Sequence, residues 1–533
     1  MGRGYGTGSR PGKGVGIGLS VSVVAARPAS PCTLGGAMAG LRSMQPVPHP
    51  LLYQVNTRVW LQELSRRSGR PATLDDVPED ELDRWRDSGF DWVWLLGVWR
   101  LGRVGPEISR SRPEWHHEFI GTLPDLGEAD IGGSCFAIVD YGVADGFGGE
   151  EALARFRARL ARRRIRLMLD FVPNHVAIDH PWVGLHPDWF IAGTAADLER
   201  SPANFIRLPD GRILAHGRDP YFPGWPDTLQ LDYSQPGLRE AMASELVSIA
   251  GRCDGVRCDM AMLLLPEVFA RTWGRSLPAF WPGAIRGVRE ARPDFLFMAE
   301  VYWDLEWTLQ QQGFDACYDK RLYDRVCHGD AASIRAHLSA GLDYQDRLAR
   351  FLENHDEPRA AAVVPFERHR AAAALTFLSP GLRFLHQGQD VGRRIRVSPH
   401  LIRAPEEAVD EALRSFYADL LATLRLPVVR EGSWQLLHPL RAWEGNPTSE
   451  DLIGMAWTGR DGSRLVVAVN FSEHAAQGFL GLPWEDLDGG HFELRDRLGP
   501  WSYDRDGGDL LRRGLYLDVP AWRVHVFDVT RIG

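Results

Sequence analysis

The chain has 533 residues, of which 44% are hydrophobic and 25% are charged, and its formal net charge is -9. This length predicts two or three globular domains, and the negative charge gives no reason to expect a nucleic-acid or membrane partner. Six cysteines without any C-x-x-C pair argue against a disulfide framework or a zinc site, and favour a reducing, cytoplasmic compartment.

Residues 1–44 differ in composition from the rest of the chain. They are rich in Gly, Ser and Arg and contain no acidic residue, so they cannot build a core of their own. We expect a disordered leader or a mis-assigned start, with Met38 or Met44 as the true beginning. An export signal is the alternative, although Gly and Ser interrupt its apolar stretch.

Residues 45–428 alternate short apolar runs with amphipathic segments, which is the pattern of βα units around a parallel sheet. Helical spacing of apolar residues predicts helices over 148–164, 236–252, 284–293, 367–378 and 406–425. Eight strands with intervening helices predict an α/β fold, a TIM (β/α)8 barrel, with an open doubly wound sheet as the alternative. The predicted strands lie within 51–60, 90–99, 165–175, 253–261, 295–303, 314–319, 348–356 and 382–390.

Two further regions complete the predicted architecture. Residues 177–233 carry Pro, Gly and Trp without a clear helix, so we expect an inserted loop domain, a short excursion after the third strand. Residues 429–533 change to short alternating runs such as "SRLVVAVNFS" and "GLYLDVPAWRVHVFDV", which predict a C-terminal all-β sandwich domain.

Acidic, histidine and arginine residues gather at the carboxyl ends of four predicted strands, in "LMLDFVPNH", "GVRCD", "FMAE" and "LENHDEPR". Active sites of barrels are built at that end. Convergent carboxylates beside aromatic side chains suit glycoside chemistry, which needs one protonated and one ionised carboxyl group. A structural Arg257–Asp259 ion pair would explain only one strand, and a metal site would lack a repeated ligand spacing.

The segments "DFVPNH", "GVRCD", "MAEVYW" and "ENHDEP" resemble the four ordered signature segments of the α-amylase-type glycoside hydrolases. The resemblance runs from "YQVNTRVW" near the first strand to "LVVAVNFS" in the β domain. It implies a retaining mechanism through a covalent glycosyl-enzyme. The implied catalytic residues are Asp259 as nucleophile, Glu300 as general acid and base, and Asp356 as stabiliser of the transition state.

The same resemblance assigns substrate contacts. Arg257 would keep Asp259 ionised, with support from Asp170. The sugar before the scissile bond would be bound by two histidines and stacked on an aromatic ring. The implied substrate-binding residues are His175, Arg257, His355, Phe136, Tyr141, Arg359 and Trp303.

The sequence departs from the family in three places. Met260 to Leu263 replace the lysine and histidine that follow the nucleophile in many amylases, so we expect no required metal and no cofactor. Arg359 resembles the arginine of the exo-acting α-glucosidase branch, but Gly133 stands where its aspartate partner would be. Trp303 is expected to line the acceptor site, whereas Trp307 and Cys258 are expected in the core.

The predicted function is therefore a retaining glycoside hydrolase or transglycosylase acting on α-glucosidic bonds of oligosaccharides. The partner would be an α-glucan oligosaccharide or α-glucoside, and the protein a monomer or small homo-oligomer. A sugar isomerase or phosphorylase could use the same intermediate. A catalytically inactive carbohydrate-binding or scaffold subunit is the alternative from another class, although all three carboxylates are present.

Overall fold

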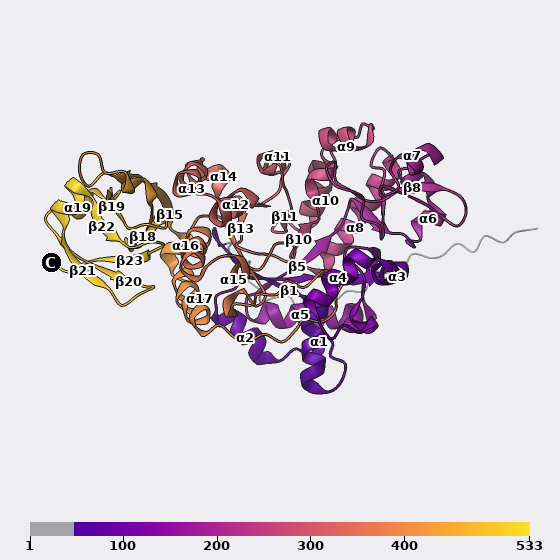
Figure 1. The fold of residues 1–533 in the computed structure, drawn as a ribbon, viewed down its shortest axis with the longest axis horizontal. Coiled ribbons are helices and arrows are strands. Elements are labelled where there is room, and N and C mark those ends of the chain that lie inside the picture. The colour runs from indigo at the N-terminus through magenta and orange to yellow at the C-terminus, as the bar shows by residue number, and fades with distance from the viewer. Residues whose placement is uncertain (1–46) are drawn as a thin grey trace, which may run out of the picture. The chain divides into compact units, whose positions relative to one another are not determined.

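Eight parallel strands close into a barrel in the computed structural model, which describes residues 47–533 (Figure 1). The leader predicted over 1–44 lies outside the described residues. Each predicted strand range contains one barrel strand, so the TIM-barrel prediction is confirmed. The strands are β1 (Leu51–Asn56), β2 (Trp92–Leu96), β5 (Arg166–Phe171), β10 (Gly255–Cys258), β11 (Leu296–Ala299), β12 (Ala316–Tyr318), β13 (Leu348–Arg350) and β14 (Leu382–His386).

Helices follow the barrel strands as the apolar spacing predicts. The predicted helix ranges correspond to α5, α8, α10, α16 and α17, with ends that differ by a few residues. None of the helices within 47–533 is long and apolar enough to cross a membrane. The main helices are α1 (Thr57–Ser68), α2 (Glu79–Asp87), α5 (Gly149–Arg162), α8 (Pro236–Arg252), α10 (Trp281–Ala291), α12 (Lys320–His328), α13 (Ala331–Leu338), α16 (Phe366–Phe377) and α17 (Glu411–Leu424).

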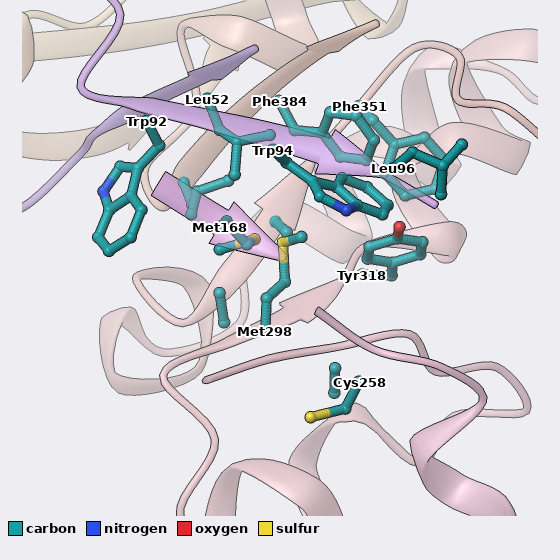
Figure 2. Close-up of a cluster of buried hydrophobic side chains, with 14 of the residues drawn as sticks. Leu52, Trp92, Trp94, Leu96, Met168, Cys258, Met298, Tyr318, Phe351 and Phe384 are labelled. Atoms are coloured by element: carbon teal, nitrogen blue, oxygen red, sulfur yellow. The ribbon is translucent and has the colours of Figure 1, made fainter. Parts of the chain in front are cut away.

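Large side chains from different barrel strands pack together, as Figure 2 shows for Leu52, Trp94, Met168, Met298 and Phe384. Strand register places them in rows, because Leu52 pairs with both Trp92 and Phe384, and Trp94 pairs with Met168. The barrel interior is therefore filled by side chains and is not a pore. Cys258 is also fully buried, as predicted for a small hydrophobic residue, and Figure 2 shows it apart from this interior cluster.

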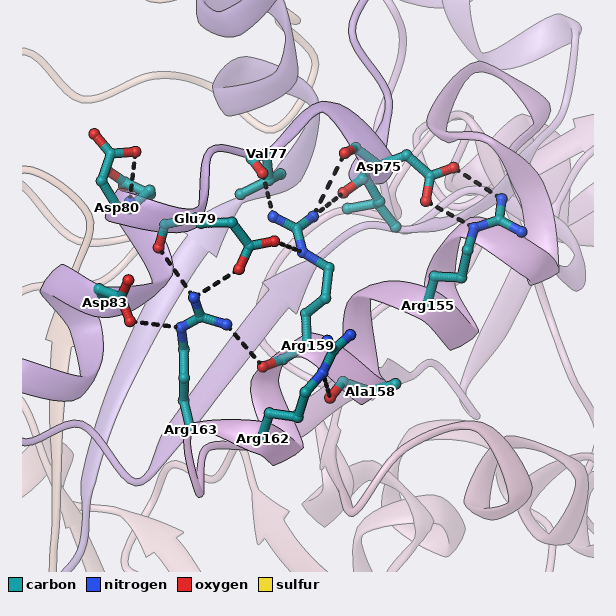
Figure 3. A network of polar contacts seen from close by, with 12 residues as sticks. Asp75, Val77, Glu79, Asp80, Asp83, Arg155, Ala158, Arg159, Arg162 and Arg163 are labelled. Carbon is teal, nitrogen blue, oxygen red and sulfur yellow. Dashed lines mark hydrogen bonds and ion pairs between the residues drawn. The ribbon is translucent and has the colours of Figure 1, made fainter. Parts of the chain in front are cut away.

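Arginines of α5 tie this helix to the segment that leads into α2 (Figure 3). Arg155 binds Asp75, and Arg159 and Arg163 both bind Glu79, with nitrogen-to-oxygen distances of 2.6–2.8 Å. The Asp75 and Glu79 carboxylates are exposed to solvent, where an ion pair stabilises a fold little. The pairs join α5 to Asp75 and to the start of α2.

The excursion after the third barrel strand forms two short antiparallel strand pairings and two short α-helices, instead of an unstructured loop. Strand β6 (His175–Ala177) pairs with β9 (Thr228–Gln230), and β7 (Phe205–Arg207) pairs with β8 (Ile213–Ala215). Helices α6 (Trp182–Leu185) and α7 (Ala195–Arg200) lie between these strands in sequence. Antiparallel pairing with β6 places the end of β9 next to the end of barrel strand β5, and the Trp225 ring, just before β9, packs against His175.

The C-terminal region consists of two antiparallel sheets that share a core, which confirms the predicted all-β sandwich domain. A six-stranded sheet has the order β15-β17-β18-β23-β20-β21, and a smaller sheet has the order β16-β19-β22. Side chains from both sheets, including Val466, Phe492, Leu480 and Leu517, form one buried cluster. The expected start of this domain at residue 429 falls within α18 (Pro427–Glu431). This helix ends two residues before β15 begins at Ser433. The strands of this domain are β15 (Ser433–Leu437), β16 (Pro439–Leu440), β17 (Leu452–Thr458), β18 (Arg464–Asn470), β19 (Ala476–Leu480), β20 (His491–Asp496), β21 (Ser502–Asp506), β22 (Leu515–Val519) and β23 (Val524–Arg531).

A buried polar cluster joins β12 and β13. Arg350 is fully buried and binds the carboxylate of Asp319 and the side chain of Gln345, and its Nε donates to the Pro380 carbonyl at 2.9 Å. His337 Nε2 lies 3.0 Å from the Asp319 carboxylate. Burial alone would raise the pKa of Asp319, but His337 and Arg350 outweigh it and hold that pKa well below the ordinary value. The cluster is stable only while all its members are present.

We therefore expect Asp319→Ala to lower the free energy of unfolding by about 3–5 kcal/mol, because it leaves Arg350 buried without a counter-ion. Adding Arg350→Met to this variant should restore part of the loss. Since the pKa of Asp319 is depressed in the folded state, its contribution is present above about pH 4 and is lost progressively as pH falls from there through the lower folded-state pKa. Urea unfolding at pH 7 and at several pH values below 4 measures both effects.

The matched control is Glu79→Ala, which removes the exposed carboxylate of the α5 network and should have a much smaller effect. An Asp319→Ala protein as stable as Glu79→Ala would contradict the structural role assigned to the buried cluster.

Candidate active site

The centre of the candidate site is the guanidinium of Arg257, which is fully buried in β10. Its Nη1 lies 2.6 Å from Asp259 Oδ1, and its Nη2 lies 2.7 Å from Glu300 Oε2. The rings of Trp94, Phe136 and Tyr318 surround it at 5.2–6.0 Å from their centroids, and Figure 2 labels two of them. Burial would lower the pKa of Arg257, but Glu300 and Asp259 outweigh it and keep the group positively charged.

Strand pairing carries the two carboxylates beyond the ends of neighbouring strands. The Asp259 amide donates to the Phe171 carbonyl at 2.8 Å, and the Glu300 amide donates to the Cys258 carbonyl at 3.0 Å. Each residue therefore extends the ladder of its strand by one position, at the carboxyl edge of the barrel. Both side chains are almost completely buried, at 5% and 3% exposure.

The carboxyl group of Glu300 has a strongly perturbed environment. It accepts from the Met260 amide at 2.7 Å and from the Tyr302 hydroxyl at 3.0 Å. Burial, and secondarily the charges of Asp259 and Asp356, raise its pKa to about 7, although Arg257 opposes the shift. A carboxyl group with this pKa is substantially protonated at neutral pH, as a general acid must be.

The pKa of Asp356 is lowered, in contrast to that of Glu300. Its side chain is 40% exposed at the rim of the cavity, and one oxygen lies 3.0 Å from His355 Nε2. The charges of His355 and Arg257 outweigh its partial burial and lower its pKa to about 2. His355 is held in turn by Gln54 Nε2, 2.8 Å from its Nδ1. Asp356 is therefore ionised across the physiological range.

These groups face a cavity of about 290 Å³. It brings together five of the sequence-predicted site residues: His175, Phe136, Asp259, Glu300 and Asp356. Burial lowers the pKa of His175, so its imidazole is neutral and able to hydrogen-bond a sugar hydroxyl. The other lining residues are Trp115, Ser134, Trp225, Asp227, Thr228, Met260, Tyr302, Pro399 and His400.

Five of the sequence-predicted substrate contacts do not line this cavity. Arg257 and His355 pair with carboxylates that do line it, and the other three are Tyr141, Arg359 and Trp303. The hydroxyl of Tyr141 donates to the Val172 carbonyl at 3.0 Å and accepts from the Val172 amide at 3.1 Å. Arg359 is buried in an ion pair with Glu353 at 2.9 Å. Trp303 packs edge-on against Tyr221, with ring centroids 4.9 Å apart. Their side chains shape the surroundings of the cavity and do not reach into it.

The segment after β11 explains the position of Trp303. Trp303 and Asp304 have φ values of 64° and 63°, so the chain leaves the extended conformation directly after Tyr302. Tyr302 consequently faces Glu300, and Trp303 turns away from it. The prediction that Trp307 belongs to the core is wrong, since 46% of its surface is exposed.

Asp170 has different partners from those expected. It pairs in register with Arg257 across β5 and β10, but its oxygens accept from Trp94 Nε1 at 3.0 Å and from the Gly97 amide at 2.6 Å. Burial raises its pKa to about 6, against the effect of Arg257. Asp170 therefore fixes the end of β2, and with it the Trp94 ring that covers Arg257.

Met260 carries local backbone strain. Its φ of 42° is unusual for a residue with a side chain, and its amide is thereby aimed at Glu300. Residues 261–264 continue as a buried 3-10 turn, where many amylases carry polar residues. Within residues 47–533, no group of three or more His, Cys, Asp or Glu side chains is arranged to hold a metal ion.

Sequence reasoning missed several cavity residues. Trp225 and Asp227 come from the excursion before β9, Trp115 comes from the short helix α4, and His400 comes from a loop without periodic pattern. The only available signal was composition, since "PGWPD" combines turn residues with an aromatic and an acid. For Tyr302, spacing two residues beyond Glu300 was a usable signal.

Comparison with known proteins agrees with this fold. No family model matches the chain. The chain is 21% identical over 294 residues to "Alpha-amylase 3" of Dictyoglomus thermophilum, covering 51% of this chain and 56% of that protein. It is 27% identical over 532 residues to "Alpha-1,4-glucan:maltose-1-phosphate maltosyltransferase 2" of Streptomyces coelicolor, covering 91% and 70%. The chain spans less than three-fifths of the length of the first curated relatives it matches.

A solved structure supports the same architecture. The maltogenic α-amylase AmyB of Thermotoga neapolitana superposes with a TM-score of 0.64 at 19% sequence identity, covering 91% of this chain and 99% of that one. The barrel, the C-terminal β domain, the four signature segments and these relatives agree with one another. The chain is therefore similar to α-amylase-type glycoside hydrolases in its fold and in its four signature segments.

Proposed function

We propose that this protein is a retaining enzyme that acts on α-glucosidic bonds of oligosaccharides, as a hydrolase or a transglycosylase. The observation that carries the proposal is the bridging of Asp259 and Glu300 by one buried guanidinium, at 2.6 and 2.7 Å. Two carboxyl groups held by one side chain lie close together. Retaining enzymes need about 5–5.5 Å between them, whereas inverting enzymes need about 6.5–9.5 Å.

The environments of the two carboxyl groups suit different tasks. Asp259 accepts a charge-assisted hydrogen bond from Arg257 at 2.6 Å, which orients the carboxyl group for the role of nucleophile. Glu300, with a pKa of about 7, holds a proton over much of the neutral range. A pair with these protonation states can break an acetal.

In the first step, an Asp259 oxygen attacks the anomeric carbon, and the bond from this carbon to the bridging oxygen breaks. The proton of Glu300 passes to that oxygen, so the leaving sugar departs neutral and Glu300 becomes a carboxylate. In the second step, Glu300 takes a proton from water or a sugar hydroxyl, whose oxygen displaces Asp259. Configuration is retained because the anomeric carbon is inverted twice.

The remaining cavity residues would hold the reacting sugar. The ionised Asp356 faces the cavity and can bind hydroxyl groups and stabilise the positive charge of the oxocarbenium-like transition state. His175 and His355 can hydrogen-bond the sugar hydroxyl groups. The Phe136 ring, whose centroid lies 5.5 Å from that of the His355 ring, offers a face on which a sugar can stack. These roles for the side chains are part of the proposal.

A phosphorylase is less well supported, because phosphate needs cations or an anion-binding nest. The cavity is lined by four acidic residues, and neither Lys nor Arg is among the described residues that line it. Arg257 lies behind Asp259 and Glu300 with both already bound to it. An isomerase would use the same first step, and only its products would distinguish it.

The names of the relatives include both an α-amylase and a maltosyltransferase, which supports hydrolysis or transfer. We also propose an oligosaccharide as partner, with no nucleic acid or membrane, and a monomer or small homo-oligomer. The five cysteines in the described part of the chain are buried and unpaired, which supports a reducing, cytoplasmic compartment.

The first test is incubation with maltotetraose, followed by proton NMR. The parent protein should release α-anomeric glucose or maltose first, or form rearranged oligosaccharides. Asp259→Asn should lose at least about 10³-fold in kcat, because the amide is a poor nucleophile. A variant that turns over like the parent would contradict the assigned nucleophile and favour the scaffold alternative.

Inorganic phosphate added to the same reaction serves as its control. We expect no α-glucose 1-phosphate and no change in rate. Formation of the sugar phosphate would contradict the proposed acceptor class and leave the covalent mechanism intact.

The second test is the pH dependence of kcat/KM. Since Glu300 must be protonated to release the leaving sugar, kcat/KM should fall as pH rises through about 7. Glu300→Gln should lower kcat/KM by about 10²–10⁴-fold and remove this basic limb. An unchanged limb in Glu300→Gln would show that another group supplies the proton.

A further inference from the structure

Two segments far apart in the chain build one wall of the cavity. Trp115 lies on α4 (Pro113–Thr122), which packs through Phe119 and Leu123 against Leu401. The Gly132 amide donates to the His400 carbonyl at 2.9 Å. Arg403 binds Asp130 at 2.8 Å on the outside of the same junction. This wall is therefore a fixed part of the cavity.

His400 presents a hydrogen-bond acceptor. The Ser109 hydroxyl lies 2.9 Å from both the Gly105 carbonyl and His400 Nδ1; when its proton is donated to the Gly105 carbonyl, His400 Nδ1 is the donor to Ser109. Burial lowers the pKa of His400 to about 3, and the ring is neutral. A neutral imidazole with its proton on Nδ1 has a free lone pair on Nε2.

Asp227 presents a second acceptor. Only 3% of its surface is exposed, and its Oδ2 has no hydrogen-bond partner among the described residues. Burial raises its pKa to about 6, although Arg112 and the Ser134 amide oppose the shift. A buried carboxyl oxygen without a partner destabilises a fold, which indicates that a ligand supplies the missing donor.

The position of the wall relative to the reacting groups follows from Phe136. Gly132, Ser134 and Phe136 belong to one loop, and the Phe136 ring lies 5.5 Å from that of His355, whose Nε2 contacts Asp356. In the proposed mechanism this side holds the sugar that Asp259 attacks. Glu300, Met260 and Tyr302 lie toward the leaving group.

We propose that Asp227 and His400, together with the Trp115 indole, form a sugar-recognition wall on the non-reducing side of the scissile bond. The wall accepts hydrogen bonds from hydroxyl groups of an uncharged sugar and selects for it. The inference rests on the proposed function and adds two specificity-determining residues to it. Because both polar groups are acceptors, a ligand must bring donors, which hydroxyl groups do and phosphate or carboxylate groups do not.

The test measures binding in the Asp259→Asn background, where chemistry is blocked. Calorimetric titration with maltotetraose should give a Kd at least about tenfold higher when Asp227→Ala or His400→Phe is added. The same two substitutions in the active protein should lower kcat/KM for maltotetraose by a similar factor. Asp210→Ala is the matched control, since this acid lies in the same excursion, is exposed and pairs with Arg212; it should leave both values unchanged.

Thermal unfolding separates recognition from a structural role. Since Asp227 has an unpartnered oxygen, Asp227→Asn should melt no lower than the parent while it weakens binding. A lower melting temperature with unchanged Kd would contradict the inference.

Failure of the recognition wall can be told from failure of the proposed function by the behaviour of the parent protein. If the parent binds and cleaves maltotetraose and both wall variants do so within twofold of it, the inference is wrong and the proposed function stands. If the parent neither binds nor cleaves maltotetraose, the proposed function fails, and this inference fails with it.

Discussion

The site depends on a buried cation that holds two carboxyl groups at once. Removing a guanidinium from water is costly, and its contacts with Asp259 and Glu300 offset that cost only when both distances are short, as they are here. The same arrangement gives the two acids different environments. Arg257 orients Asp259 through a hydrogen bond of 2.6 Å, whereas burial and neighbouring negative charges raise the pKa of Glu300 to about 7.

The barrel supplies the buried environment that holds Arg257 between Asp259 and Glu300. Trp94, Phe136 and Tyr318 exclude water from the guanidinium, and Asp170 fixes Trp94 through its indole nitrogen. Residues at equal heights on β5, β10 and β11 bring Asp170, Arg257 and Met298 into one row. Each carboxylate then follows directly from a rigid strand end, while the excursion and the loop at His400 shape the space for the sugar.

The sequence predicted all eight barrel strands and the residues at their carboxyl ends, because apolar runs and their polar ends are local patterns. It did not predict the partners of Arg359 and Tyr141, since those depend on how loops fold over the barrel. Trp303 was misplaced because positive φ angles end the strand alternation after Tyr302. Asp227 and His400 lie in segments without periodicity, so only the tertiary structure brings them to the cavity.

The central claim is that Asp259 becomes bonded to the sugar while Glu300 handles the proton. It is tested most directly by trapping with a 5-fluoro-α-glucosyl fluoride, whose good leaving group lets the intermediate form and whose second fluorine slows its breakdown. Mass spectrometry of the intact protein should show one added fluoroglucosyl group, and peptide analysis should locate it on Asp259. An adduct on another residue, or none while the reagent is consumed, would contradict the account.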